Sequence, residues 1–344
     1  MANMNVKTPR FYVDTINYLL SRGVAQNGEF DVLATDAGAY KMGTFTTGSE
    51  PELFDMNPLN KVTFDTSADT DAHVMVTIDT QSTSSKKNFV AILNHNMNSA
   101  DAKVLIKGSD TAGHVAAVDM GSATVMGNPA EVVNADAISS SIVTPGTDGS
   151  TIVTFDESSL RYWGIQFEGN SSNTFGSTDL FVGCILIGEY FDAPHAPDLE
   201  IQRQIIFDGV DVLESNGGKR FANMRHGGRT HTATSKSPFS LGYPGQEGYG
   251  GRLAYDVNFS FLASSELMPN RYESLVHTDD TVVSDVWNKT NGPHIPFIFS
   301  CDNTSTGSNA ESEHIFARFA QNSLNMSQVA NDYWNVSMRI EEEF

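Results

Sequence analysis

Short stretches in which apolar and polar residues alternate occur along the chain, and the clearest of them closes it. In residues 334–344, Trp334, Val336, Met338 and Ile340 alternate with polar side chains. A period of two places these four side chains on one face of a β-strand and the polar ones on the other. The pattern therefore predicts a half-buried strand that ties the C-terminus into a sheet.

Other runs rich in Val, Ile, Thr and Phe lie between clusters of Gly, Ser, Asn and Asp, and a helical period is nearly absent. In the first part of the chain, the predicted strands are 73–80, 88–93, 103–108, 150–155, 161–168 and 180–190. The last run lacks alternation, which indicates a central strand covered on both faces. Many short strands separated by turn residues are typical of an all-β sandwich or barrel.

A change of composition divides the chain near its middle. Pro194 and Pro197 bracket a short polar hinge, which predicts a boundary between one domain at 1–194 and a second at 195–344. The opening residues from Lys7 to Asp14 form a further candidate strand, which we expect to pair with the second domain.

Beyond this boundary, the pattern predicts a hairpin of 199–207 with 210–214, followed by a tight turn at 216–218. The Gly-, Ser- and Thr-rich segment 224–251 is predicted to be a long loop, a class that is usually functional or mobile. In the predicted strand 253–262, Val257, Phe259 and Phe261 would share one face. The remaining elements are a helical region at 266–288, with Pro269 at its start, and strands at 295–299 and 314–319.

Charge narrows the classes of partner. The formal net charge is -21, and both halves are acidic, so nucleic acid and anionic membrane surfaces are poor partners. Cys184 and Cys301 are too few for a disulfide framework and are predicted to be buried free thiols. The N-terminus lacks the apolar core of a signal peptide, and no run of about 18 apolar residues occurs. We therefore expect a soluble protein made in the cytoplasm.

The loop 224–251 carries the first candidate site. Arg225, His226, Arg229 and His231 lie within seven consecutive positions. Two imidazoles could bind a metal, but the spacing of the neighbouring residues does not indicate a third ligand, and the guanidinium groups repel cations. We interpret these four residues as a contact to a neighbouring subunit, whose acidic surface would suit their charge.

Two other polar clusters can be explained either as binding sites or as structural turns. Asp65, Asp69 and Asp71 offer oxygen ligands for calcium, but the Gly and distal Glu of an EF-hand are missing, so a solvated turn is preferred. Residues 94–98 could bind a sugar or cap turns, and turn capping is preferred. The chain has no nucleophile elbow and no phosphate-binding loop. We therefore predict no enzyme activity, no metal and no cofactor.

Two regions resemble known families. Residues 88–96 and 103–109 resemble strands of galactose-binding-like jelly-roll domains, which are common in virion appendage proteins. Residues 199–214, 293–299, 315–319 and 328–344, in that order, resemble the minor and distal tail proteins of tailed bacteriophages, whose small β-barrel closes with an acidic, alternating strand. The resemblance implies an all-β chain with an N-terminal jelly-roll-like β-sandwich and a C-terminal small tail-type β-barrel.

The tail-protein resemblance implies a structural virion protein, which forms or decorates a homo-oligomeric ring at the tail tip and connects the tube to the adhesion parts. It implies partners among other phage tail proteins and supplies no catalytic residues. The large N-terminal β-domain departs from a minimal tail barrel and leaves room for sugar binding. Two alternatives therefore stay open, a capsid decoration protein and a virion protein that binds a glycan receptor.

Overall fold

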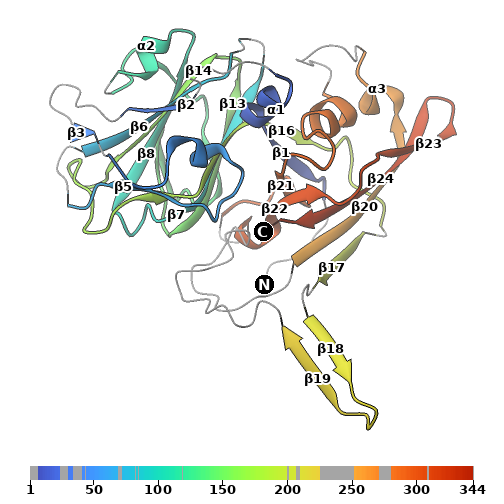
Figure 1. Ribbon diagram of the computed structural model, residues 1–344. Helices are drawn as coiled ribbons and strands as arrows, with labels where there is room; N and C mark the ends of the chain where they lie inside the picture. Colours follow the sequence, from blue (N-terminus) through green and yellow to red (C-terminus); the bar gives the residue numbers. More distant parts are fainter. Residues whose placement is uncertain are drawn as a thin grey trace.

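The computed structural model describes residues 7–23, 30–33, 41–42, 44–68, 72–81, 83, 85–117, 119–199, 201–206, 210–224, 252–270, 280–307 and 310–343. Strands dominate these residues, which confirms the all-β class predicted from the sequence. Figure 1 shows a β-sandwich beside a second group of strands that includes the C-terminal one, with a separate hairpin below them.

One sheet runs through both halves of the molecule. Its strands, in spatial order, are β10 (Ala130–Val133), β13 (Gly149–Ser158), β7 (Lys87–His95), β16 (Cys184–Asp192), β1 (Arg10–Asp14), β21 (Phe297–Ser300), β22 (His314–Phe319), β24 (Tyr333–Glu342), β20 (Arg252–Ala263) and β17 (Gln202–Ile206), and β23 (Asn325–Ala330) also pairs with β24. Strand β1 joins the halves because it pairs with β16 on one side and with β21 on the other. The division into two domains stays a prediction.

A second sheet completes the N-terminal sandwich. It contains β11 (Ala137–Ser139), β12 (Ile142–Thr144), β8 (Ala102–Ser109), β14 (Tyr162–Gly169), β6 (Ala72–Asp79) and β2 (Phe30–Leu33), with β3 (Lys41–Met42) on β6 and β9 (Thr124–Val125) on β8. Val90 and Ile187 of the first sheet share a buried cluster with Ile106 and Trp163 of the second. Apolar faces of two sheets thus enclose one core, as predicted for a jelly-roll-like β-sandwich.

Strand β16 confirms the prediction of a central strand. Ile185 and Ile187 contact the sandwich core, whereas Cys184 and Leu186 belong to a separate cluster on the opposite face of the sheet. The predicted run 180–190 is interrupted at Gly183, which separates β15 (Phe181–Val182) from β16. A Cβ there would lie 2.3 Å from the carbonyl oxygen of Pro58, so only glycine fits this close backbone approach.

Strand β15 pairs with β5 (Val62–Asp65), which in turn pairs with β4 (Thr44–Thr47). The helices are short: α1 (Thr15–Ser21), η1 (Glu50–Phe54), α2 (Ala112–Val115), α3 (Ser264–Leu267), the π-helix η2 (Val282–Asn288) and α4 (Ala310–Glu313). None of the helices in the described part of the chain is long and apolar enough to cross a membrane. Within the predicted helical region 266–288, the described residues form the end of α3 and η2, and Pro269 follows α3. Residues 271–279 lie outside the described part of the chain.

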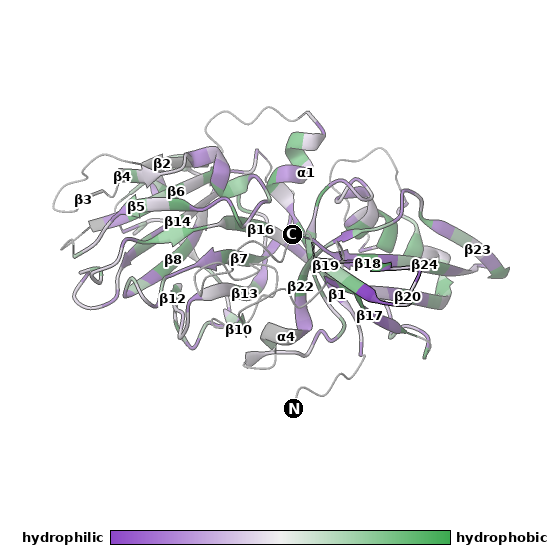
Figure 2. Cartoon of the chain, turned by 60° about the horizontal axis from the view of Figure 1, so that its bottom comes forward, coloured by the Kyte–Doolittle hydropathy of each residue, from purple (hydrophilic) through white to green (hydrophobic). Residues whose placement is uncertain are grey.

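The C-terminal strand forms as predicted. Val336, Met338 and Ile340 are buried, and they pack with Val257 and Phe259 of β20. The predicted small barrel is not found, because across the described residues these strands continue the long open sheet, which ends at β17. Figure 2 shows hydrophobic and hydrophilic segments along the strands of both halves.

Two predictions about strands were wrong. Phe261 is 63% exposed, because a bulge between Phe259 and Leu262 gives Phe261 a φ of 61° and turns Leu262 into the core instead. The predicted hairpin partner of 210–214 was also wrong. Strand β17 pairs with β20, and β18 (Val210–Glu214) pairs with β19 (Arg220–Met224) across the turn predicted at 216–218. Strand β17 pairs with a segment far away in the sequence, which local turn signals do not reveal, whereas the hairpin of β18 and β19 closes on the local turn.

Candidate functional site

The hairpin β18–β19 projects from the body of the molecule as an arm (Figure 1). Its strands pair only with each other among the strands that the structure describes. The turn is closed by two backbone hydrogen bonds, from Ser215 N to the Lys219 carbonyl (2.9 Å) and from Gly218 N to the Ser215 carbonyl (2.8 Å). A two-stranded hairpin is at best marginally stable in water, so an arm of this kind favours contact with another surface.

The arm presents an apolar pair on one face. Leu213 and Phe221 lie directly opposite each other across the two strands and are 68% and 51% exposed. Val212, on the other face, is 58% exposed. Burying a Leu or Phe side chain completely stabilises by about 1.5–3 kcal/mol. Exposed side chains of this size on a projecting element are typical of an interaction surface.

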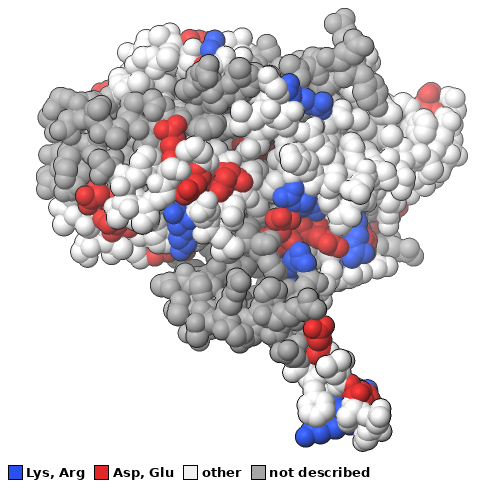
Figure 3. Space-filling view, in the orientation of Figure 1, with Lys and Arg blue, Asp and Glu red and all other residues white. Residues whose placement is uncertain are grey.

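Basic groups lie at the far end of the same arm (Figure 3). The Lys219 ammonium lies 5.1 Å from the centre of the Phe221 ring, and the Arg220 guanidinium lies 3.2 Å from the Glu214 carboxylate. Arg220 and Glu214 are both largely exposed, so this ion pair adds little to stability. The two cations therefore remain accessible to a partner.

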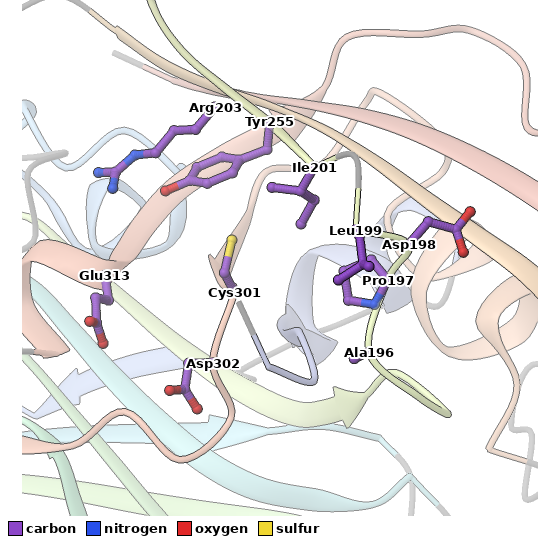
Figure 4. Close-up of a pocket in the computed structure, with 10 residues that line it drawn as sticks. All are labelled: Ala196, Pro197, Asp198, Leu199, Ile201, Arg203, Tyr255, Cys301, Asp302 and Glu313. Carbon is purple, nitrogen blue, oxygen red and sulfur yellow. The ribbon is translucent and has the colours of Figure 1, made fainter. Parts of the chain in front are cut away.

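A pocket of about 370 Å³ lies close to the strand that leads into the arm (Figure 4). Apolar side chains and one thiol form much of its wall, and charged groups complete it. The lining residues are Ala196, Pro197, Asp198, Leu199, Ile201, Arg203, Tyr255, Cys301, Asp302 and Glu313. A largely apolar wall with a few polar groups is typical of a binding pocket.

Burial sets the protonation of two side chains in this pocket. Burial raises the pKa of the Cys301 thiol to about 12, so the thiolate that a nucleophile needs is scarce at neutral pH. Burial also raises the pKa of Tyr255, and the Arg203 guanidinium lies 5.6 Å from its ring. At Asp302, burial opposes ionisation, but hydrogen bonds from Thr304 and Lys7 outweigh it and lower the pKa. The Asp302 carboxylate is therefore negatively charged.

A second pocket, of about 500 Å³, is lined by residues of both halves. It is lined by Asn88, Phe155, Asp156, Glu157, Glu189, Tyr190, Phe191, Asp192, Pro194, Glu266 and Asp280. We call it the acidic cleft. Carboxylate oxygens accept hydrogen bonds, and aromatic faces offer apolar contact. This combination suits a polar ligand with apolar faces.

Many of the carboxylates in the acidic cleft already have cationic partners. The Lys289 ammonium lies 2.7 Å from Glu189, and Arg10 donates two hydrogen bonds to Asp192, at 2.6 and 2.8 Å. Burial raises the pKa of Glu189, and the Lys289 charge offsets part of that shift. In the described ranges, no group of three or more His, Cys, Asp or Glu side chains is arranged to hold a metal ion.

The predicted interface residues Arg225, His226, Arg229 and His231 lie outside the described residues, so their role stays a prediction. Asp69 and Asp71 also lie outside them.

For residues 94–98, the hydrogen bonds confirm turn capping. The Asn94 amide donates to the Pro58 carbonyl, and the Asn96 side chain bonds the Asp179 carbonyl and the Phe181 amide. His95 is buried, with its Nε2 atom 2.9 Å from Thr151 Oγ1, and burial lowers the pKa of the His95 imidazole to about 3. These side chains therefore hold loops together.

Sequence reasoning missed the arm and the pocket as candidate sites. The arm had a usable signal, because apolar Leu213 and Phe221 lie at equal distances from the predicted turn at 216–218. Reading that turn as the centre of the hairpin would have paired them. The pocket had no such signal, since Arg203, Tyr255 and Cys301 come from three distant segments.

Comparison with known proteins gives only distant structural likenesses. No protein-family model and no curated protein matches the chain. The chain is similar to a chitosan-binding module of a chitosanase/glucanase from Paenibacillus sp. IK-5 (14% identity, 48% of this chain and 95% of that one, TM-score 0.29). It is also similar to CBM32-1 of a family 31 glycoside hydrolase from Clostridium perfringens (15% identity, 47% of this chain and 94% of that one, TM-score 0.30).

A third likeness is to truncated AlyQ with CBM32 and alginate lyase domains, at 14% identity over 84% of this chain and 57% of that one, with a TM-score of 0.27. TM-scores of this size carry no argument about function.

Proposed function

We propose that this chain is a non-catalytic structural protein that assembles with copies of itself, as part of the tail of a tailed bacteriophage. In this proposal it forms or decorates a ring at the tail tip and connects the tube to adhesion parts. The observation that supports self-assembly is the projecting arm with its exposed apolar pair. The tail location is supported by the resemblance of residues 199–214 and 328–344 to tail proteins.

The free energy of burial gives the arm a reason to assemble. In an isolated subunit, Leu213 and Phe221 are mostly in water. Because the two side chains are 68% and 51% exposed, their burial on a neighbour would contribute about 2–4 kcal/mol before the entropic cost of association. Repeated around a ring, such a contact could hold the subunits together without any covalent link.

Size-exclusion chromatography with light scattering tests the assembly. We expect the wild-type protein to form multimers, and the double variant Leu213→Asp/Phe221→Asp to be a monomer with an unchanged melting temperature. Ser215→Asp, in the turn of the arm, is a matched control and should still assemble. A wild-type protein that is monomeric at all concentrations would contradict the proposal. Cryo-electron microscopy of virions then separates a tail ring from a capsid decoration.

The acidic cleft favours a second candidate, the recognition of a glycan. Its exposed carboxylates, Glu157 and Asp280, could accept hydrogen bonds from sugar hydroxyls, with Tyr190 beside them. In a glycan-binding screen, this candidate predicts a specific ligand whose affinity falls about tenfold or more in Glu157→Gln/Asp280→Asn, because charge-assisted hydrogen bonds are lost. Equal binding by wild type and variant would remove the cleft as the site.

A further inference from the structure

We infer that the pocket lined by Tyr255 and Cys301 in one subunit receives the arm of the next subunit, with Phe221 seated inside it. This inference rests on the proposed self-assembly and names the two surfaces that meet. It is carried by the shape and charge of the pocket and of the arm.

The first argument is apolar fit. The pocket of about 370 Å³ has Leu199, Ile201 and the Tyr255 ring on its wall, and Leu199 is fully exposed. Buried aromatic anchors in well-packed pockets supply much of the binding energy of protein interfaces. Phe221, next to Leu213 on the arm, is an aromatic anchor of this kind and is without a pocket in its own hairpin.

The second argument is charge. The lining contains the carboxylates of Asp198, Asp302 and Glu313 and the guanidinium of Arg203. Lys7 pairs with Asp302 at 3.1 Å and Asp198 accepts a hydrogen bond from Ser260, whereas Glu313 accepts one from the neutral Ser305 hydroxyl and keeps its charge available to a partner. The arm brings Lys219 and Arg220 close to Phe221. In a chain with a net charge of -21, two copies repel each other unless cations of one copy meet carboxylates of the other. Phe221 in the pocket would bring the Lys219 ammonium near the Glu313 carboxylate, while Arg220 stays paired with Glu214.

The third argument concerns symmetry. Contact between two arms that point in the same direction would bring their Lys219 ammonium groups together, which is unfavourable. Contact between an arm and a pocket joins two different surfaces, so each subunit keeps a free arm on one side and a free pocket on the other. Heterologous contacts of this type close into rings when the rotation permits. The arm-in-pocket contact is therefore compatible with the proposed ring.

Mixing two defective variants tests the contact. Ala196→Trp should block the pocket, because Ala196 is an exposed residue at its wall, and Leu213→Asp/Phe221→Asp should disable the arm. Each variant alone should be monomeric, with a normal melting temperature. Their mixture should form one-to-one dimers and nothing larger, because it contains one working arm and one working pocket.

The outcomes separate this inference from the proposed function. Normal assembly of Ala196→Trp, or a mixture that stays monomeric, would overturn the arm-in-pocket contact while leaving self-assembly intact. A wild-type protein that never assembles would instead refute the proposed function. Light scattering of the separate and mixed proteins distinguishes all of these cases.

Native Cys301 allows a second test by disulfide cross-linking. Phe221→Cys places a thiol at the proposed anchor, and copper-phenanthroline as oxidant should link it to Cys301 of a neighbouring subunit, giving covalent multimers on a non-reducing gel. Cys184, the other cysteine, is buried in the core. The product should disappear with Cys301→Ser added.

The matched control is Val212→Cys, on the opposite face of the arm. It should cross-link about tenfold less, because a disulfide forms only when the two Cα atoms approach to about 4.4–6.8 Å. Equal cross-linking from both faces, or none from Phe221→Cys in a protein that assembles, would exclude Phe221 as the anchor.

Discussion

Strand β24 and the arm β18–β19 carry similar alternating patterns with opposite outcomes. In β24, Val336 and Ile340 are 1% and 0% exposed, whereas in the arm Leu213 and Phe221 are 68% and 51% exposed. The difference lies in the neighbours. Strand β24 pairs with β20, β22 and β23, but β18 and β19 pair with each other alone. Alternation thus predicts which face of a strand is apolar, whereas its neighbours decide whether the same chain covers that face.

The largest effect expected from this comparison is in β24. Val336→Asp/Ile340→Asp should unfold the C-terminal half, because each substitution buries an unpaired charge at a cost of about 3 kcal/mol or more. Circular dichroism during heating measures the loss. Ser337→Asp, on the exposed face of the same strand, should change stability by less than about 0.5 kcal/mol. Normal melting of the double variant would refute the buried assignment.

A slightly smaller effect is expected where the two halves meet. The Lys289 ammonium lies 2.7 Å from both Glu189 and Asp285, so Lys289→Met leaves two buried carboxylates without their cation. The expected cost is about 3–5 kcal/mol, measured by urea unfolding. Lys86→Met should cost less than about 1 kcal/mol, since its partners Glu157 and Asp280 are exposed. Equal losses would show that burial does not control the strength of these pairs.

Much of the fold can be predicted from the sequence, because the alternation of apolar and polar residues in a strand involves only neighbouring positions. The inward side chains of β24 and the buried character of β16 are both read from adjacent residues. Phe261 was misplaced because a bulge shifts the alternation by one residue, and a bulge has no fixed sequence mark. The pairing of β17 with β20 and the convergence of Arg203, Tyr255 and Cys301 depend on non-local packing, which a single sequence does not encode in any short pattern.

The buried end of β24 also predicts a pH dependence. Burial raises the pKa of Glu342 to about 7 from an ordinary value of 4.5, so the folded state binds the proton more tightly than the unfolded state. This contribution to stability is complete below pH 4.5 and is lost as the pH rises to about 7. The Glu342→Gln side chain does not ionise, so this variant does not lose stability in that way as the pH rises. Its amide oxygen can still accept the hydrogen bond that Leu253 N gives to Glu342.

The stability of Glu342→Gln relative to wild type should therefore rise by about 1–3 kcal/mol across this interval, measured by urea unfolding at a series of pH values. Glu341→Gln, which points to the other face of β24, is the matched control. It removes one negative charge from the same strand and so controls for the change in net charge. A flat difference for Glu342→Gln would mean that its carboxylate is ionised in the fold without penalty.

The smallest effect on stability is expected in the arm, and it provides the most direct test of the comparison. Leu213→Ser should change the free energy of unfolding of the dissociated subunit by less than about 0.5 kcal/mol, since Leu213 is mostly in water. Leu262→Ser, the same substitution at a buried position of β20, should cost about 2–5 kcal/mol through lost burial and a cavity. The effects on assembly should be reversed. Leu213→Ser should weaken assembly, whereas any folded Leu262→Ser protein should still assemble. If Leu213→Ser were as destabilising as Leu262→Ser, the arm would be part of the folded core, and its apolar pair would no longer indicate a partner.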